Sequence, residues 1–170
     1  KRTIEEAREH KAKGEAEAYD RIKESLPCFT LNFSFNKKKK DDNIKAPTGF
    51  LYIDVDNTLK VNLTNQLIFA SWKSLSGRGV GVLVKVENLT LANFKSTYFD
   101  IAESLNIKAD KYAAKATQYN IHSHDEDLYI NNHSTTWYAK DVIVKTPNTV
   151  TYRKEKEKDV NINMMFKESE

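Results

Sequence analysis

The sequence predicts an α+β domain with a mostly mixed sheet, and three observations lead to this assignment. Apolar runs of strand length lie at residues 49–55, 67–72 and 80–86. Two segments, residues 3–25 and 91–105, carry apolar residues at helical spacing. The chain has 170 residues, of which 39% are hydrophobic, and this is enough to bury one core. Strands mixed with two main helices also fit an α/β fold.

The N-terminal segment, residues 3–25, is predicted to be a surface helix. Thr3 as N-cap and Glu6 three positions later form a capping box, Gly14 weakens or interrupts the helix, and Pro27 ends it. We therefore divide the chain into a helical extension (residues 1–25), a main domain (26–155) and a charged C-terminal tail (156–170).

The main domain begins with "CFTLNFSF", residues 28–35, whose alternating apolar side chains predict one strand with a buried side. A lysine-rich loop follows at residues 36–43, where the charges are typical of solvated positions. The three apolar runs are then strands, and residues 91–105 form an amphipathic helix packed on the sheet. We expect further extended structure at residues 118–124, 136–144 and 149–153, with an acidic turn at 125–127.

Composition limits the function classes. The net charge of +3 permits a nucleic-acid partner without requiring one. The single cysteine, Cys28, excludes an internal disulfide framework and a cysteine zinc cluster, which suits a cytoplasmic location. No apolar run is long enough to span a bilayer, so we expect no membrane partner. The start at Lys1 and the charged end suggest a segment of something longer.

The stretch "GFLYIDVDNTL" places Asp54 and Asp56 at the end of a buried strand. Residues two apart on a strand point to the same side, so both carboxylates face together while Val55 points into the core. Paired carboxylates repel unless a cation lies between them, and Mg²⁺ or Mn²⁺ uses such hard oxygen ligands with open positions for phosphate. The other interpretation is a strand end whose aspartates only cap a loop.

A second motif, "SLSGRG" at residues 74–79, follows about twenty residues later. The glycines Gly77 and Gly79 allow the backbone to approach an anion, while Ser74, Ser76 and the loop amides donate hydrogen bonds and Arg78 adds charge. This loop is predicted to hold phosphate, although such a sequence also forms simple turns.

Four stretches in this order, "SLPCFTLNFSF", "GFLYIDVDNTL", "SLSGRGVGVLVKV" and "NIHSHDEDLYIN", resemble the N-terminal domain associated with virulence-associated protein E. That family is a branch of the archaeo-eukaryotic primase and primase-polymerase superfamily, and the resemblance covers about residues 20–137. It implies an RNA-recognition-like sheet with flanking helices and template-directed nucleotidyl transfer in a phage or mobile-element replication protein.

The resemblance also implies site residues and partners. Asp54, Asp56 and Asp110 would be the catalytic residues and would bind two Mg²⁺ or Mn²⁺ ions, while Ser74, Ser76, Gly77, Arg78 and Gly79 would bind the nucleotide. The expected partners are nucleoside triphosphates, a single-stranded nucleic acid template, and a helicase domain or subunit.

The sequence departs from the family pattern at two places. Gly81 stands where relatives have a basic residue, and Gln118 stands at a usual arginine, with Lys115 at the acidic position before it; Ser123 and Asp125 are kept. We therefore expect Arg78 to carry the phosphate contact, and Gly81→His or Gly81→Lys to strengthen binding if the backbone tolerates a side chain.

Two other functions stay open. One is a catalytically degenerate nucleic-acid-binding or assembly module of the same fold. The other is a phosphatase of the haloacid dehalogenase type, in which Asp54 would be the nucleophile and Asp56 the acid/base, but the later acidic cluster follows histidines rather than an apolar run. Aromatic side chains would either stack on bases or pack in the core, namely Trp72, Tyr119, Trp137 and Tyr138.

Overall fold

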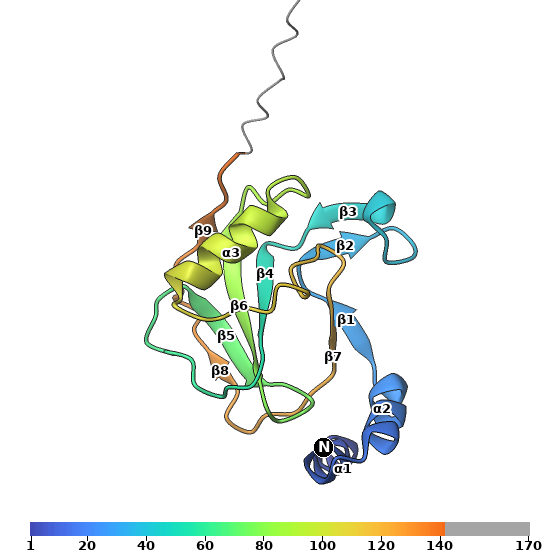
Figure 1. Cartoon of the computed structure of the whole chain (residues 1–170). Helices are drawn as coiled ribbons and strands as arrows, with labels where there is room; N and C mark the ends of the chain where they lie inside the picture. The colour runs from blue at the N-terminus through green and yellow to red at the C-terminus, as the bar shows by residue number, and fades with distance from the viewer. Residues whose placement is uncertain (142–170) are drawn as a thin grey trace, which may run out of the picture.

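The computed structural model describes residues 1–141 and shows an α+β fold, as the sequence predicts. Its central sheet has the strand order β4 (Phe50–Val55), β6 (Val80–Glu87), β5 (Ile68–Lys73) and β8 (Tyr129–Ile130), with every pair antiparallel. The strand β9 (Trp137–Tyr138) pairs in parallel with the end of β6, which makes the sheet mixed. Figure 1 shows these strands behind helix α3 (Phe94–Ser104).

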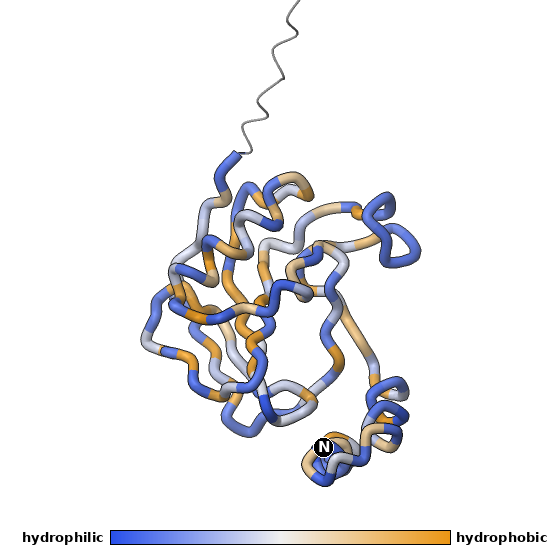
Figure 2. The backbone as a smooth tube through the Cα atoms, viewed as in Figure 1, coloured by the Kyte–Doolittle hydropathy of each residue, from blue (hydrophilic) through white to orange (hydrophobic). Residues whose placement is uncertain are grey.

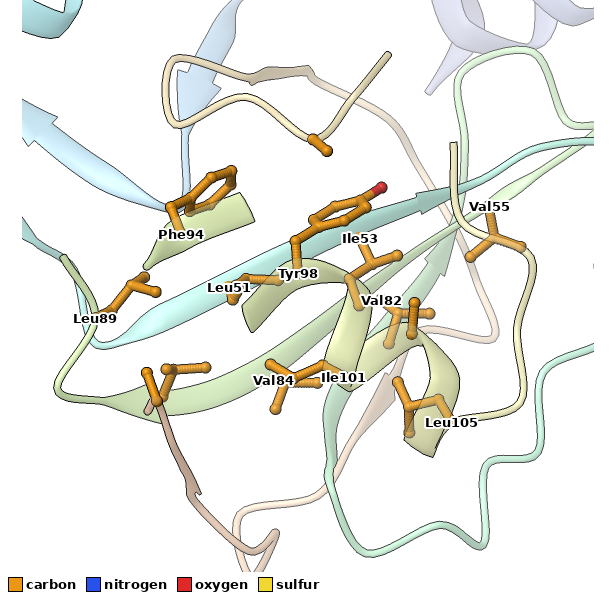
Figure 3. Packing of buried hydrophobic residues seen from close by; sticks show 14 of the residues in the cluster. Leu51, Ile53, Val55, Val82, Val84, Leu89, Phe94, Tyr98, Ile101 and Leu105 are labelled. Atoms are coloured by element: carbon orange, nitrogen blue, oxygen red, sulfur yellow. The ribbon is translucent and has the colours of Figure 1, made fainter. Parts of the chain in front are cut away.

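One face of the central sheet carries the main core. Side chains at alternate positions of β4, such as Leu51, Ile53 and Val55, pack against Val82 and Val84 of β6 and against α3 (Figure 3). The helix starts at Phe94 rather than at residue 91, because the Asn93 side chain bonds the backbone of the preceding turn through Thr90 N and Asn88 O.

The opposite face of the sheet carries aromatic side chains and the first acidic residue. Phe50, Tyr52 and Asp54 alternate with the core residues of β4, and Trp72 of β5 lies on the same face. In the strand register, Gly81 of β6 lies between Asp54 on one side and Trp72 on the other.

The N-terminal segment is a pair of helices, α1 (Arg2–Lys13) and α2 (Ala16–Ser25). The predicted interruption at Gly14 is confirmed, since this residue ends α1 with a left-handed φ of 78°. The predicted capping box is wrong, because Lys1 is the N-cap and makes no side-chain capping bond. Figure 2 shows that the two helices are largely hydrophilic; their few apolar residues pack together and against Leu75.

Residues 28–35 do not form the single predicted strand. β1 (Cys28–Thr30) pairs with β7 (Tyr119–Ile121), and β2 (Phe33–Phe35) pairs with β3 (Ile44–Pro47), which follows a short helix, η1 (Asp41–Asn43). The break lies at Asn32, which is buried and accepts a 2.8 Å hydrogen bond from Tyr52 N. A buried amide needs such a partner, so the chain bends there and Phe29 is left exposed.

The remaining predictions for the C-terminal part are only partly testable. Part of the extended segment 136–144 is present as β9, whereas residues 142–144 and 149–153 and the tail 156–170 lie outside the described residues. Within residues 1–141, no helix has both the length and the apolar character needed to cross a bilayer.

Candidate functional site

A cavity of about 610 Å³ brings together residues that lie far apart in the sequence. Its lining includes five of the residues predicted for the site, namely Asp54, Asp56, Ser74, Ser76 and Arg78. Side chains from α1, from α2 and from the β7 segment line it as well. The two motifs, Asp-Val-Asp and the serine-glycine loop, therefore share one cavity.

The two aspartates are placed as alternation predicts. Asp54 is half-buried at the end of β4, Val55 is in the core, and Asp56 is exposed in the following turn. Burial and the neighbouring Asp56 charge raise the pKa of Asp54 from 3.8 to about 6. The Tyr52 hydroxyl donates to Asp54 Oδ1 at 3.3 Å and opposes this rise only partly. A cation would relieve this unfavourable negative charge.

Asp110 lies beside Asp54 but does not line the cavity. Its backbone N donates to Asp54 O at 3.1 Å, and its charge contributes to the raised pKa of Asp54. The Asp110 carboxylate accepts a hydrogen bond from Tyr112 N at 2.8 Å, which turns it toward its own loop. Its predicted role as third metal ligand stays a prediction.

The serine-glycine loop is closed by its own hydrogen bonds. Gly77 N donates to Ser74 O, Arg78 N to Ser76 Oγ and Gly79 N to Ser74 Oγ, at 3.0, 3.2 and 3.2 Å. These three amides are thus used inside the loop rather than presented to a ligand. The two hydroxyl oxygens lie 3.0 Å apart, so one O–H bonds the other serine, and both side chains line the cavity.

The loop glycines explain why the two motifs meet. Gly77 has a φ of 71°, as a tight turn requires. A Cβ at Gly79 would lie 2.5 Å from Val55 O, so only glycine lets the loop approach the end of β4 this closely. Glycine at 79 therefore sets the distance between the loop and the aspartates.

The structure explains why residue 81 is glycine, which the sequence does not show. Tyr52 and Trp72 stack across it, with ring centroids 5.6 Å apart and planes inclined by 26°. A Cβ at Gly81 would lie 2.6 Å from Tyr52 Cε2 and 2.9 Å from Trp72 Cε2. Gly81→His or Gly81→Lys was expected to strengthen binding on the condition that a side chain is tolerated here, and this condition is not met, because the rings occupy the space.

The cations of the site come partly from residues that the sequence analysis did not single out. Lys11 of α1 and Lys23 of α2 line the cavity with Arg78, whose Nη2 donates to Lys11 O at 3.1 Å. Arg8 lies between the loops, where its Nη2 donates to Ser74 O, Ser123 Oγ and His124 O at 3.1, 3.2 and 2.8 Å. In the sequence, Arg8, Lys11 and Lys23 lie in a charged segment with helical spacing, which indicates only a solvated helix face.

The retained Ser-x-Asp motif holds the end of β5. Ser123 Oγ donates to Lys73 O at 2.8 Å, and Asp125 Oδ2 accepts from Lys73 N at 2.7 Å. Gln118, at the usual arginine position, lines the cavity and donates to Tyr119 O at 3.3 Å. Tyr119 also lines the cavity, 42% exposed, with Lys39 Nζ 3.6 Å from its ring centroid.

The other aromatic candidates divide between packing and exposure. Trp72 stacks on Tyr52, and Trp137 packs against the main core, whereas Tyr138 is exposed. In the part of the chain that the structure describes, no group of three or more His, Cys, Asp or Glu side chains is arranged to hold a metal ion. A metal in the cavity would therefore take two carboxylates from the protein and the rest of its ligands from phosphate and water, a common arrangement for Mg²⁺.

A family model supplies the comparison with known proteins. Residues 21–130 match the model described as BT4734-like, N-terminal domain, so the match covers strands β1 to β8 and both motifs but leaves out α1, the start of α2 and β9. Searches of curated proteins and of solved structures gave no significant match.

Proposed function

The chain belongs to the BT4734-like N-terminal domain family, and we propose that its cavity is the active site of a primase-polymerase-like nucleotidyltransferase. The reaction would add nucleotides to a primer or first nucleotide on a single-stranded template, in a replication protein of a phage or mobile element. The observation that carries the proposal is the meeting of Asp54, Asp56, Ser74, Ser76 and Arg78 around one cavity.

The size and chemistry of the cavity support a nucleotide. A volume of about 610 Å³ falls in the range of small-molecule and cofactor sites. A serine hydroxyl and the Arg78 guanidinium are donors suited to phosphate oxygens. The three acidic side chains of the lining, Asp20, Asp54 and Asp56, would be unfavourable for an anion alone, so the ligand would be a polyphosphate that enters with a cation.

Asp54 and Asp56 would hold Mg²⁺ or Mn²⁺, and Asp110 would join them only if its side chain turned away from Tyr112 N. A bound metal would neutralise the triphosphate and activate the attacking 3′ hydroxyl. The protein itself keeps two carboxylates close together at the end of a strand. The raised pKa of Asp54 means that its negative charge is unfavourable without a nearby cation.

A template would follow the rim near Tyr119. This exposed ring lines the cavity and carries Lys39 from the lysine-rich loop over its face. A ring that binds bases next to cations that bind phosphate is the combination used for single strands. A helicase partner and a cytoplasmic location follow from the same role in replication.

The second candidate is a nucleic-acid-binding or assembly module that has lost turnover. The specific observation in its favour is that Tyr52 and Trp72 close the space above Gly81, so this strand position offers no side chain to phosphate. The phosphatase alternative is less favoured, because Asp125, Glu126 and Asp127 line a separate cavity of about 190 Å³ rather than the one that Asp54 lines.

Primer extension tests the proposal. The full chain, and any longer parent protein, is incubated with a labelled primer on a single-stranded template, Mn²⁺ and ribo- or deoxyribonucleoside triphosphates. Extension is expected for the wild type, and should be lost in Asp54→Asn and Asp56→Asn but kept in Asp42→Asn, which removes an exposed carboxylate elsewhere. If the protein binds single strands but extends no primer, the polymerase proposal is wrong and the nucleic-acid-binding module is the better interpretation.

A further inference from the structure

We infer that the α1–α2 hairpin is part of the ligand site, and that Lys11 and Lys23 bind the polyphosphate group of the ligand. This inference rests on the proposed function, since it names the residues that would hold the triphosphate. The hairpin is defined here as residues 2–25, and its first helix lies outside the family match.

The hairpin is fixed against the site at several points. Ile4, Ala7 and Tyr19 form a buried cluster with Leu75, which belongs to the serine-glycine loop. Arg8 bonds both this loop and the 123–124 segment, and its side chain lies over Gly77, where a Cβ would be 3.3 Å from Arg8 Cδ. Because these contacts join two helices to two loops of the cavity, the hairpin holds its side chains at a defined distance from the site.

Among the described residues, Lys11 and Lys23 are cations without a carboxylate partner. Both line the cavity and are half-buried, and within residues 1–141 neither forms an ion pair with a carboxylate. Lys11 Nζ lies 4.7 Å from the Tyr19 ring centroid, which restricts where its ammonium can be. Ammonium groups are favourable next to an anion, and a ligand phosphate would supply one.

The two lysines would take over the contact that the sheet does not offer. Gly81 presents no side chain, and three loop amides are already bonded within the loop. The cavity lining carries three basic side chains, those of Lys11, Lys23 and Arg78. It also carries three acidic ones, Asp20, Asp54 and Asp56, so a metal bound at the last two would leave the cavity positive and ready for a polyphosphate.

The test uses inorganic tripolyphosphate with Mn²⁺, titrated calorimetrically into the full chain. The double variant Lys11→Gln/Lys23→Gln should bind about tenfold more weakly or worse, because each lysine is a charged contact. The matched control Lys13→Gln/Arg21→Gln removes the same charge from exposed positions of the same helices, outside the cavity, and should stay within about twofold of the wild type. Lys11→Arg/Lys23→Arg keeps the charge and should restore binding, which separates charge from packing of the hairpin.

The outcomes are distinct from those of primer extension. Equal binding by the wild type and the Lys11→Gln/Lys23→Gln variant, an equal loss in the control pair, or no binding by the wild type would each overturn the inference. If the chain extends primers but its tripolyphosphate affinity is the same with and without the two lysines, the polymerase function is supported and the hairpin is not part of the ligand site. If the chain extends no primer but the Lys11→Gln/Lys23→Gln variant selectively loses tripolyphosphate binding, the anion site is supported and the polymerase function is not.

Discussion

Replacing Gly81 by alanine should destabilise the protein, although the same change at an unobstructed strand position would have the opposite effect. The new Cβ would lie 2.6 Å from Tyr52 Cε2 and 2.9 and 3.0 Å from two atoms of the Trp72 ring. Carbon atoms in good contact are about 3.5 to 4.0 Å apart, so the methyl group is about 1 Å too close on the Tyr52 side. Tyr52 is only 4% exposed and bonds Asp54, so it cannot simply swing into solvent.

The expected size follows from overpacking. Inserting a methyl group into a filled site costs about 1 to 3 kcal/mol. For a chain of this size, that lowers the unfolding midpoint by about 2 to 12 °C. A glycine with free space above it would instead gain about 0.4 to 1 kcal/mol on substitution by alanine, since the unfolded chain loses freedom. The sign of the change therefore tests the geometry.

Thermal and urea unfolding of the wild type and Gly81→Ala measure the difference, and Tyr52→Leu provides the partner for a double-mutant cycle. Tyr52→Leu removes the ring atom closest to the new methyl group, so Gly81→Ala should cost less in that background. A Gly81→Ala variant as stable as the wild type, with no coupling to Tyr52, would refute the argument. That result would also mean that a basic side chain could be accommodated at position 81.

Three other predictions follow from the site. The pKa of Asp54 is raised to about 6, so its charge opposes folding as the pH rises through that value, at a cost of at most about 3 kcal/mol. Asp54→Asn should therefore have a higher melting temperature than the wild type at pH 8 but not at pH 4. Equal melting temperatures of the two proteins at both pH values would contradict this. Arg8→Ala should lower stability by about 1 to 3 kcal/mol, because three acceptors lose their donor, while Arg2→Ala at an exposed position serves as the control in the same urea series. Arg78→Ala should weaken the binding of nucleoside triphosphate with Mn²⁺ by about tenfold or more in a fluorescence titration, and unchanged affinity would remove this residue from the site.

The sequence by itself determined the central strands, the sheet-packed helix and the residues of the two motifs. Strand and helix periodicity come from local geometry, so the apolar runs around Leu51, Val82 and Ile101 could be read directly. Alternation also predicted correctly that Val55 would be buried between two aspartates that face the cavity. The split of residues 28–35 could not be read, because it depends on Asn32 bonding Tyr52 of a distant strand.

Only the tertiary structure decided what surrounds the aspartates. Gly81 looks like the loss of a useful charge in the sequence, but the stacked rings of Tyr52 and Trp72 require glycine there. Arg8 and Lys11 look like part of a solvated helix face, yet packing of the hairpin on Leu75 brings Arg8 against the serine-glycine loop and Lys11 into the cavity lining. Such contacts join residues that are tens of positions apart, and no local periodicity encodes them, because they depend on how the helices and loops pack around the sheet.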